Sequence, residues 1–345
     1  YAGMQFPAGA LVDRVGERAL LTLSVVAGAV TMAGYALSPT FAVFLVATAG
    51  FGFASGLYGP ARGIVLSRVY TDRDGAAFGT VLATGSVGAA ILPPLATYAT
   101  GLVGWRGALG LTIPGFLFAG YALRAHVPDR PPTDPGANAT GGANTPDLNL
   151  RSRLRTGAGD IRRAVSSRKV ALAVAGTTLM LFVFQGVTAF LTTYFVVEKG
   201  LPERTAATLF GVLFLSAAVF QSVGGALADR FGHGRVLATV SLVGVVPLAA
   251  LPYTGSLPVL TVVVALLGMR LSIGPISNAY IVSVLPAEIR GTAWGTVRTG
   301  FFIIGAFGST AVGSLADANL FAEAFLLLAG LTAVAGVIYA FLPER

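Results

Sequence analysis

The chain has 345 residues, of which 54% are hydrophobic and only 11% charged, with a mean hydropathy of +0.77 and a formal net charge of +8. Soluble domains carry about 25% charged residues, so this composition argues against soluble enzymes, nucleic-acid binders and disordered proteins. With no cysteine and two histidines, the chain has no disulfide framework, and a histidine-rich metal site is not expected. These features predict an integral membrane protein.

Long apolar runs predict ten complete membrane-spanning helices, since one span needs about 20 mostly apolar residues. Four of these runs precede residue 125 and six follow residue 169, with turns at 38–40 and 252–258 inside two longer runs. The runs do not alternate as the strands of a membrane β-barrel do, so the predicted fold class is all-α. Residues 1–12 are apolar but too short to cross, and we expect them to be the second half of a helix.

A polar segment, residues 125–169, separates an N-terminal transmembrane bundle, residues 1–124, from a six-helix C-terminal bundle, residues 170–345. Its first part is rich in Pro, Gly, Asn and Thr, which is typical of a disordered linker. Its second part is basic, with apolar residues on one face. It could be a helix lying on the membrane surface or a solvated basic linker.

The basic residues predict the orientation. If residues 13–18 face the cytoplasm, so do the central loop and the C-terminus, and the cytoplasmic segments then hold 17 of the 23 Lys and Arg. This asymmetry follows the positive-inside rule and predicts a multi-pass protein of the cell membrane. The net charge of +8 then reflects topology and contact with anionic lipid, and no nucleic-acid partner is expected.

Two segments recur at a fixed offset of 216 residues. The stretch from Gly9 to Gly16 matches that from Gly225 to Gly232, and the stretch from Gly75 to Val81 matches that from Gly291 to Val297. Two parallel repeats are a known plan of membrane transporters, with the substrate site between the halves near the membrane midplane. The offset also predicts that one helix and half of the next are missing from the front of this chain.

The repeated motif resembles the signature of the major facilitator superfamily, G-x-x-x-D-R-x-G-x-R. The first copy keeps Asp13, Arg14, Gly16 and Arg18, and the second keeps Asp229, Arg230 and Gly232, with Arg235 one position beyond the expected basic residue. The resemblance covers essentially the whole chain and includes the Trp105-Arg106 pair. It implies two pseudo-symmetric six-helix bundles, here N-terminally truncated, and we expect a monomer.

The two aspartates of the motif are candidate gating residues. We expect Asp13 to face the N-terminus of the helix that begins near Thr292, and Asp229 to face the helix that begins near Ala76. A carboxylate at such a position is favoured by the helix dipole. The resemblance implies that this cluster latches the cytoplasmic side shut while the substrate site opens outward. The alternative is that Asp13 and Arg14 only fix the topology and cap a turn.

Charges inside membrane spans are costly and usually functional. Arg270, in the middle of its span, is the first candidate for binding an anionic group, and Arg298 is the second. Arg270 could instead pair with backbone carbonyls or with a carboxylate outside this sequence. Three neutral residues could line the cavity or bond between helices: Gln185, Asn278 and Tyr280. Three prolines are candidates for helix flexing: Pro93, Pro94 and Pro275.

The sequence therefore predicts a secondary active transporter of a small organic solute, with an anion favoured, that works by alternating access and is not an enzyme. We expect no cofactor and no metal; the partners are the solute, the lipid bilayer and a coupling ion, proton or sodium. One alternative is an antiporter that exports hydrophobic drugs, although the paired glycines typical of exporters read Gly88-Ala89 here. Another is a non-transporting sensor or scaffold on the same fold.

Overall fold

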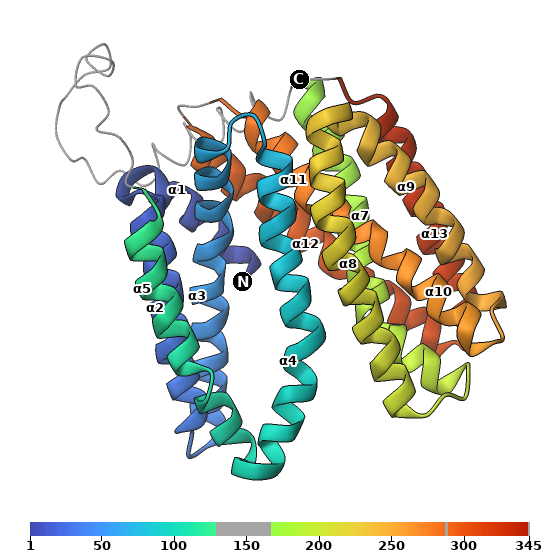
Figure 1. Cartoon of the computed structure of the whole chain (residues 1–345), viewed down its shortest axis with the longest axis horizontal. Helices are drawn as coiled ribbons and strands as arrows, with labels where there is room; N and C mark the ends of the chain where they lie inside the picture. The colour runs from blue at the N-terminus through green and yellow to red at the C-terminus, as the bar shows by residue number, and fades with distance from the viewer. Residues whose placement is uncertain (129–166, 287–288, 344–345) are drawn as a thin grey trace. The chain divides into compact units, whose positions relative to one another are not determined.

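A computed structural model describes residues 1–128, 167–286 and 289–343, and every regular element in these ranges is a helix (Figure 1). Before the central loop these are η1 (Ala2–Met4), α1 (Gln5–Val15), α2 (Glu17–Ala36), α3 (Phe41–Val69), α4 (Asp74–Gly110) and α5 (Ile113–His126). After it come α7 (Arg168–Val197), α8 (Glu203–Phe231), α9 (His233–Ala250), η2 (Leu251–Tyr253), α10 (Leu257–Gly268), η3 (Met269–Ser272), α11 (Ile273–Val284), α12 (Arg290–Asp317) and α13 (Phe321–Ala340). The predicted all-α class is confirmed.

Ten helical segments of the described chain are long and apolar enough to cross a membrane. Four lie before the central loop and six after it, as the apolar runs predict. The surface helix considered for the basic part of the loop lies outside the described residues.

The structure groups its helices into two compact units, described here separately. One comprises Tyr1–Val65, Val103–Ser167 and Leu285–Thr296, and within it α2 packs against α5. The other comprises Leu66–Leu102, Arg168–Val284 and Val297–Arg345, and within it α13 packs against α9 and α7 while α8 packs against α10. The start of α12 thus belongs to the first unit and the start of α4 to the second. The division into bundles at 1–124 and 170–345 stays a prediction.

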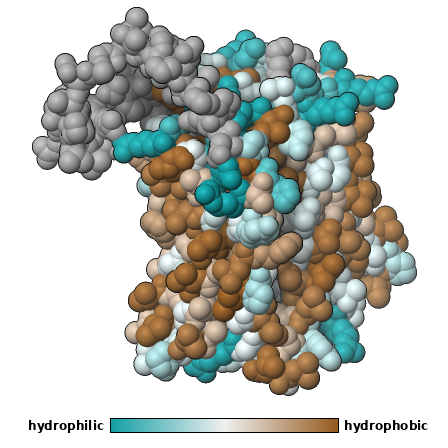
Figure 2. Space-filling view, turned by 60° about the vertical axis from the view of Figure 1, so that its left-hand side comes forward, coloured by the Kyte–Doolittle hydropathy of each residue, from teal (hydrophilic) through white to brown (hydrophobic). Residues whose placement is uncertain are grey.

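The surface of the helices suits lipid. Large apolar side chains such as Phe41, Val46 and Phe118 are more than two-thirds exposed, and Figure 2 shows hydrophobic residues over much of the face that it draws. Exposed apolar surface on this scale is rare on soluble monomers. Inside the second unit, the ring of Tyr194 lies 4.7 Å from that of Phe325 and 5.7 Å from that of Phe321, in a core built from several helices.

Glycines make two sharp corners that the repeat relates. Gly16 joins α1 to α2 with a φ of 81°, and Gly232 joins α8 to α9 with a φ of 94°. The amide of Gly16 donates to the carbonyl of Val12, and that of Gly232 donates to the carbonyl of Ala228, at 3.0 Å in both cases. A positive φ strains residues with a Cβ, so the motif requires glycine at these two places.

Helix α4 contains a kink. Gly104 has a φ of 71° inside it, where two helices meet, and the next two residues are the Trp105-Arg106 pair. The guanidinium of Arg106 stacks 4.4 Å from the Trp105 ring and donates to the carbonyl of Ser38 at 2.9 Å. The pair therefore ties this kink to the turn between α2 and α3.

The span that contains Arg270 is broken in its middle. It runs as α10, the 3-10 turn η3 and α11, and Pro275 lies in the first turn of α11, where a missing backbone N–H costs little. The break leaves backbone carbonyls without helical partners. The side-chain amide of Gln221 on α8 donates to one of them, the carbonyl of Leu271, at 3.3 Å. Backbone groups freed inside a membrane are satisfied by neighbouring helices in this way.

Candidate functional site

The first candidate site, called the first latch below, joins the end of α1 to the start of α12. Asp13 lies in the last turn of α1, and its Oδ2 accepts hydrogen bonds from the amide and the hydroxyl of Thr292, both at 2.9 Å. These donors belong to the first turn of α12, whose amides have no partner within the helix. A carboxylate at this position is stabilised by the hydrogen bonds and by the helix dipole.

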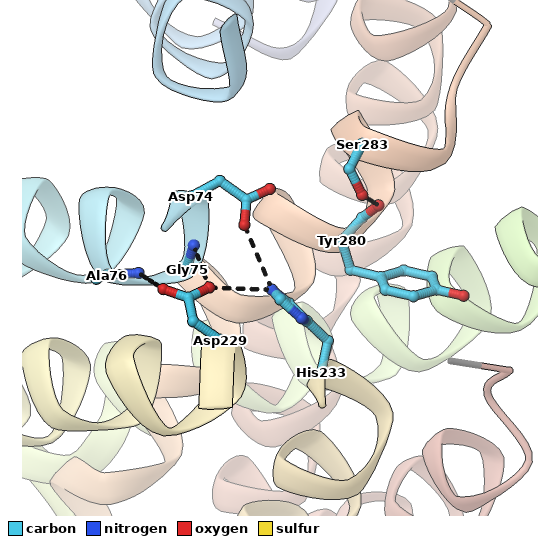
Figure 3. A network of polar contacts seen from close by, with 7 residues as sticks. All are labelled: Asp74, Gly75, Ala76, Asp229, His233, Tyr280 and Ser283. Carbon is cyan, nitrogen blue, oxygen red and sulfur yellow. Dashed lines mark hydrogen bonds and ion pairs between the residues drawn. The ribbon is translucent and has the colours of Figure 1, made fainter. Parts of the chain in front are cut away.

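The second latch repeats this arrangement at the end of α8 and the start of α4 (Figure 3). Oδ1 of Asp229 accepts from the amide of Gly75 at 2.9 Å, and Oδ2 accepts from the amide of Ala76 at 2.8 Å. Asp229 thus uses both carboxylate oxygens, one for each amide. Both contacts expected from the repeat are present, and each joins helices from opposite halves of the sequence.

Glycine allows the helices to meet closely at both latches. A Cβ added to Gly9 would overlap the carbonyl oxygen of Gly291, and one added to Gly225 would overlap that of Gly75. The obstructing atoms are backbone, so they cannot swing away as a flexible side chain can. Small residues at a membrane helix interface serve this purpose, and here they let a side-chain carboxylate reach the amides of the facing helix.

The basic residues of the motif lie at the surface. Arg14, Arg230 and Arg235 are exposed and Arg18 is half-buried. The guanidinium of Arg230 lies 5.1 Å from the centre of the Phe231 ring. The three exposed arginines have access to lipid headgroups or water, and the two aspartates bond to the starts of the facing helices.

One further pair of residues at the offset of 216 stands outside the motif, and two buried residues beside Asp229 are related by no offset. Gln5 and Gln221 are both buried: Gln5 donates to the carbonyl of Gly56 at 3.2 Å, and Gln221 accepts from the hydroxyl of Ser86 at 2.8 Å. Asp74 and His233 are buried beside Asp229. Applying the offset to every polar residue, and not only to the glycine motif, could have identified the glutamines. The meeting of Asp74 with His233 needed the three-dimensional fold.

Arg270 is buried within the second unit. Its side chain is 6% exposed and passes along Gly244 of α9, where an added Cβ would lie 2.6 Å from the Cγ of the arginine. Its Nη2 donates to the hydroxyl of Thr332 on α13 at 3.1 Å, while its Nε makes no hydrogen bond. Among the residues that the structure describes, no carboxylate forms an ion pair with it. Arg270 is thus a cation inside the protein with donor capacity left over.

The other predicted substrate residues do not gather around Arg270. Arg298 on α12 is 3% exposed and lies over the rings of Phe301 and Phe302, at 5.8 and 5.0 Å. Tyr280 is buried next to His233 and donates to the carbonyl of Pro343 at 2.8 Å. At 1.5 Å per helical residue it lies about 15 Å along its span from Arg270. Asn278 is buried, and Gln185 on α7 is half-buried.

The candidate flexing prolines differ in setting. Pro93 and Pro94 lie side by side inside α4 with exposed rings, and the helix continues through them. Pro275 is buried, directly after the η3 break. A break next to a proline is the kind of discontinuity that membrane helices use at functional positions.

The ten candidate spans of the described residues, the repeat and the two matching latches define the class of this chain: a multi-pass helical membrane protein whose sequence contains an internal repeat. The profile of the Major Facilitator Superfamily matches residues 1–295 and again residues 204–345. The chain belongs to the major facilitator superfamily, whose members are membrane transporters and not enzymes.

The known proteins to which the chain is similar agree with this assignment. It is 37% identical over 138 residues to an uncharacterised MFS-type transporter, YfnC, of Bacillus subtilis (strain 168), an alignment that spans 38% of this chain and 33% of that relative. Its fold is similar to that of the E. coli fucose:proton symporter FucP, with a TM-score of 0.73 and 17% identity over 99% of this chain and 88% of the other. It is also similar to the human organic anion transporter MFSD10, with a TM-score of 0.77 and 18% identity over 98% of this chain and 81% of the other.

Proposed function

We propose that the protein is a secondary active transporter that moves a small organic anion by alternating access, with both latches holding its cytoplasmic side closed in one state of the cycle. The single observation that supports this best is the pair of latches. Each connects helices of opposite sequence halves through one carboxylate and two donors. Such contacts break and reform without rearranging a hydrophobic core, as a cycling transporter requires.

The preference for an anion is supported by the buried arginines. Arg270 and Arg298 are both nearly fully buried within spanning helices, where a charge is expensive unless it has a task. A guanidinium can bind a carboxylate through two parallel hydrogen bonds. MFSD10, which shares the fold, is an organic anion transporter, and we extend that substrate class to this chain as part of the proposal.

Transport by the purified protein in liposomes tests the proposal. The substrate panel pairs each organic acid with its neutral amide, and each pair is measured with an inward proton gradient, an inward sodium gradient and no gradient. We expect accumulation of an acid, but not of its amide, under one of the gradients. Export of hydrophobic dyes with no uptake of acids would favour the drug antiporter, and absence of any flux would favour a sensor or scaffold.

Replacing Asp13 by Asn tests the first latch. The amide oxygen of asparagine still accepts one hydrogen bond, but the charge that interacts with the α12 dipole is lost. Hydrogen bonds to charged groups contribute about 1.5–3 kcal/mol against about 1 for neutral ones, so we expect transport to fall about tenfold. Initial uptake rates at equal amounts of reconstituted protein measure this change.

Asp72→Asn is the matched control, because Asp72 lies exposed in the loop just before α4. It removes the same charge without touching a latch and should transport normally. If Asp13→Asn and Asp72→Asn transport equally fast, the first latch has no role in the cycle.

A further inference from the structure

A histidine lies between two aspartates at the second latch (Figure 3). His233 is the first residue of α9, and its Nε2 lies 3.7 Å from Oδ1 of Asp74 and 3.8 Å from Oδ1 of Asp229. Asp74 begins α4 and is 2% exposed, while His233 is 5% exposed. One imidazole nitrogen is therefore almost equally distant from two carboxylates that belong to different helices.

The repeat shows that this titratable residue is confined to one latch. At the offset of 216, His233 corresponds to Glu17 and Asp74 corresponds to Arg290. Glutamate and arginine as residue types keep their charge through the neutral range, whereas histidine changes charge between pH 5 and 8. The positions related by the repeat thus hold a glutamate and an arginine instead of a histidine and an aspartate.

The charge on His233 changes what Nε2 can do. In neutral imidazole only one of the two ring nitrogens carries a hydrogen, whereas both carry one in the cation. Both oxygens of Asp229 already accept amide hydrogens from α4, so this carboxylate is fixed in place. Two carboxylates at one site disfavour each other's charge, and a cation between them removes that cost. Protonation of His233 therefore stabilises the assembly of Asp74, Asp229 and the start of α4.

Two further titratable or charged residues lie on α11 and on α9, the helix of His233 itself. Among the described residues, the ring of Tyr280 on α11 lies 6.2 Å from that of His233, with its hydroxyl donating to the carbonyl of Pro343. On α9 itself, Arg235 is exposed. The two aspartates are acidic groups within ion-pair distance of Nε2, at 3.7 and 3.8 Å.

A divalent metal ion is the competing occupant, because the ligand atoms of Asp74, Asp229 and His233 lie within 4.8 Å of one another. The hydrogen bonds favour a proton. Both Asp229 oxygens already accept hydrogen bonds from amides of α4, so a metal ion would have to compete with these bonds, whereas a proton is held by Nε2 of the histidine itself.

We propose that His233 is a proton-operated switch of the second latch: when protonated it holds Asp74 at the start of α4 to Asp229 at the end of α8, and when neutral it weakens that contact. The consequence for transport rests on the proposed role of the latches in the cycle. As the pH on this side of the membrane falls, the second latch tightens while the first is unaffected. The transport rate then responds to pH through the contact between helices, independently of any coupling ion.

Hydrogen–deuterium exchange tests the switch without a substrate. The amides of Gly75 and Ala76 are donors to Asp229, so their protection reports the second latch, and the amide of Thr292 reports the first. The protein is measured in lipid nanodiscs at about pH 6 and about pH 8, on either side of the ordinary histidine pKa, with rates corrected for the intrinsic effect of pH on exchange.

We expect the start of α4 to be about tenfold better protected at the lower pH, since charge-assisted hydrogen bonds are roughly twice as strong as neutral ones. The start of α12 should be equally protected at both. His233→Gln should remove the difference, and Asp74→Asn should remove it independently while leaving the Asp229 contacts in place. A pH difference that survives both variants, or one that is absent from the unaltered protein, overturns the proposal.

Zinc and transport measurements separate the remaining outcomes. If added Zn²⁺ protects the start of α4 at about pH 8 and a chelator reverses this, the site belongs to a metal ion, and the proton switch is wrong. If the exchange difference is present but transport in liposomes shows no dependence on His233, the switch stands and the proposed role of the latch in the cycle fails.

Discussion

Gly225→Val is expected to slow transport about a hundredfold while leaving a folded, membrane-inserted protein. A Cβ at this position would overlap the carbonyl oxygen of Gly75, with the carbonyl carbon of Gly75 2.7 Å away and the Cα of Ala76 3.2 Å away. All three are backbone atoms, so α8 and α4 must separate before the side chain fits. Overpacking costs about 1–3 kcal/mol, and with backbone in the way we expect the upper end, about a hundredfold loss of rate.

Gly211→Val on the same helix is the control, since an added Cβ there meets nothing within 4 Å. It introduces the same β-branched residue into α8 without approaching the latch. For Gly225→Val, both the uptake rate and the hydrogen–deuterium exchange at the start of α4 should change. For Gly211→Val, neither should change. Equal rates for the two variants would show that close approach at the second latch is dispensable.

Arg270→Met is expected to lower the affinity for an anionic solute by about a hundredfold or more, since removing one partner of a buried hydrogen-bonded charge pair costs about 2–5 kcal/mol. The same change should leave the thermal stability equal or higher. Arg270 is a buried cation without an ion pair among the described residues, and replacing a buried charge by an apolar side chain of similar size is often stabilising. Thermal unfolding of the purified protein and the KM for uptake are the two measurements.

The opposite result has a clear meaning. If Arg270→Met lowers the melting temperature and leaves KM unchanged, the arginine holds α13 through Thr332 and does not bind the solute; Thr332→Val should then reproduce the loss of stability. Arg62→Met is the control for removing an arginine from a span. Arg62 is half-buried and lies 5.3 Å from the centre of the Tyr58 ring. The Arg62→Met protein should therefore keep nearly the same affinity for the solute and nearly the same transport rate.

Much of the fold could be predicted from the sequence because a bilayer permits few kinds of spanning structure. Span length and composition predict the ten helices, and the single offset of 216 predicts that Asp13 faces Thr292 and that Asp229 faces Ala76. A contact that is expected in one copy of a repeat is also expected at the related residues of the other copy. The positions of two aspartates and two helix starts are therefore enough to predict both latches. The kink of α4 at Gly104 is not among these predictions, because apolar composition does not report the φ of a single glycine.

The surroundings of individual side chains could not be predicted in the same way. Arg270 lies in the middle of its span, as expected, but the 3-10 turn Met269–Ser272 rotates the helix at that point. Which neighbours it meets therefore depends on geometry that the apolar pattern does not encode. The sequence leaves two uses open for Tyr280 and Asn278, lining the cavity or bonding between helices, and the hydroxyl of Tyr280 donates to the carbonyl of Pro343. Asp74 and His233 are 159 positions apart and outside any pattern.

The two latches have unlike neighbours, and this difference makes the two copies of the repeat unequal. The imidazole of His233 lies beside Asp229, whereas the residue that corresponds to His233 at the offset of 216 is Glu17. Histidine as a residue type changes charge near neutral pH. With His233 acting as proposed, the second latch alone weakens in alkaline surroundings, so a duplicated protein with unlike copies acquires a defined first step on its opening path.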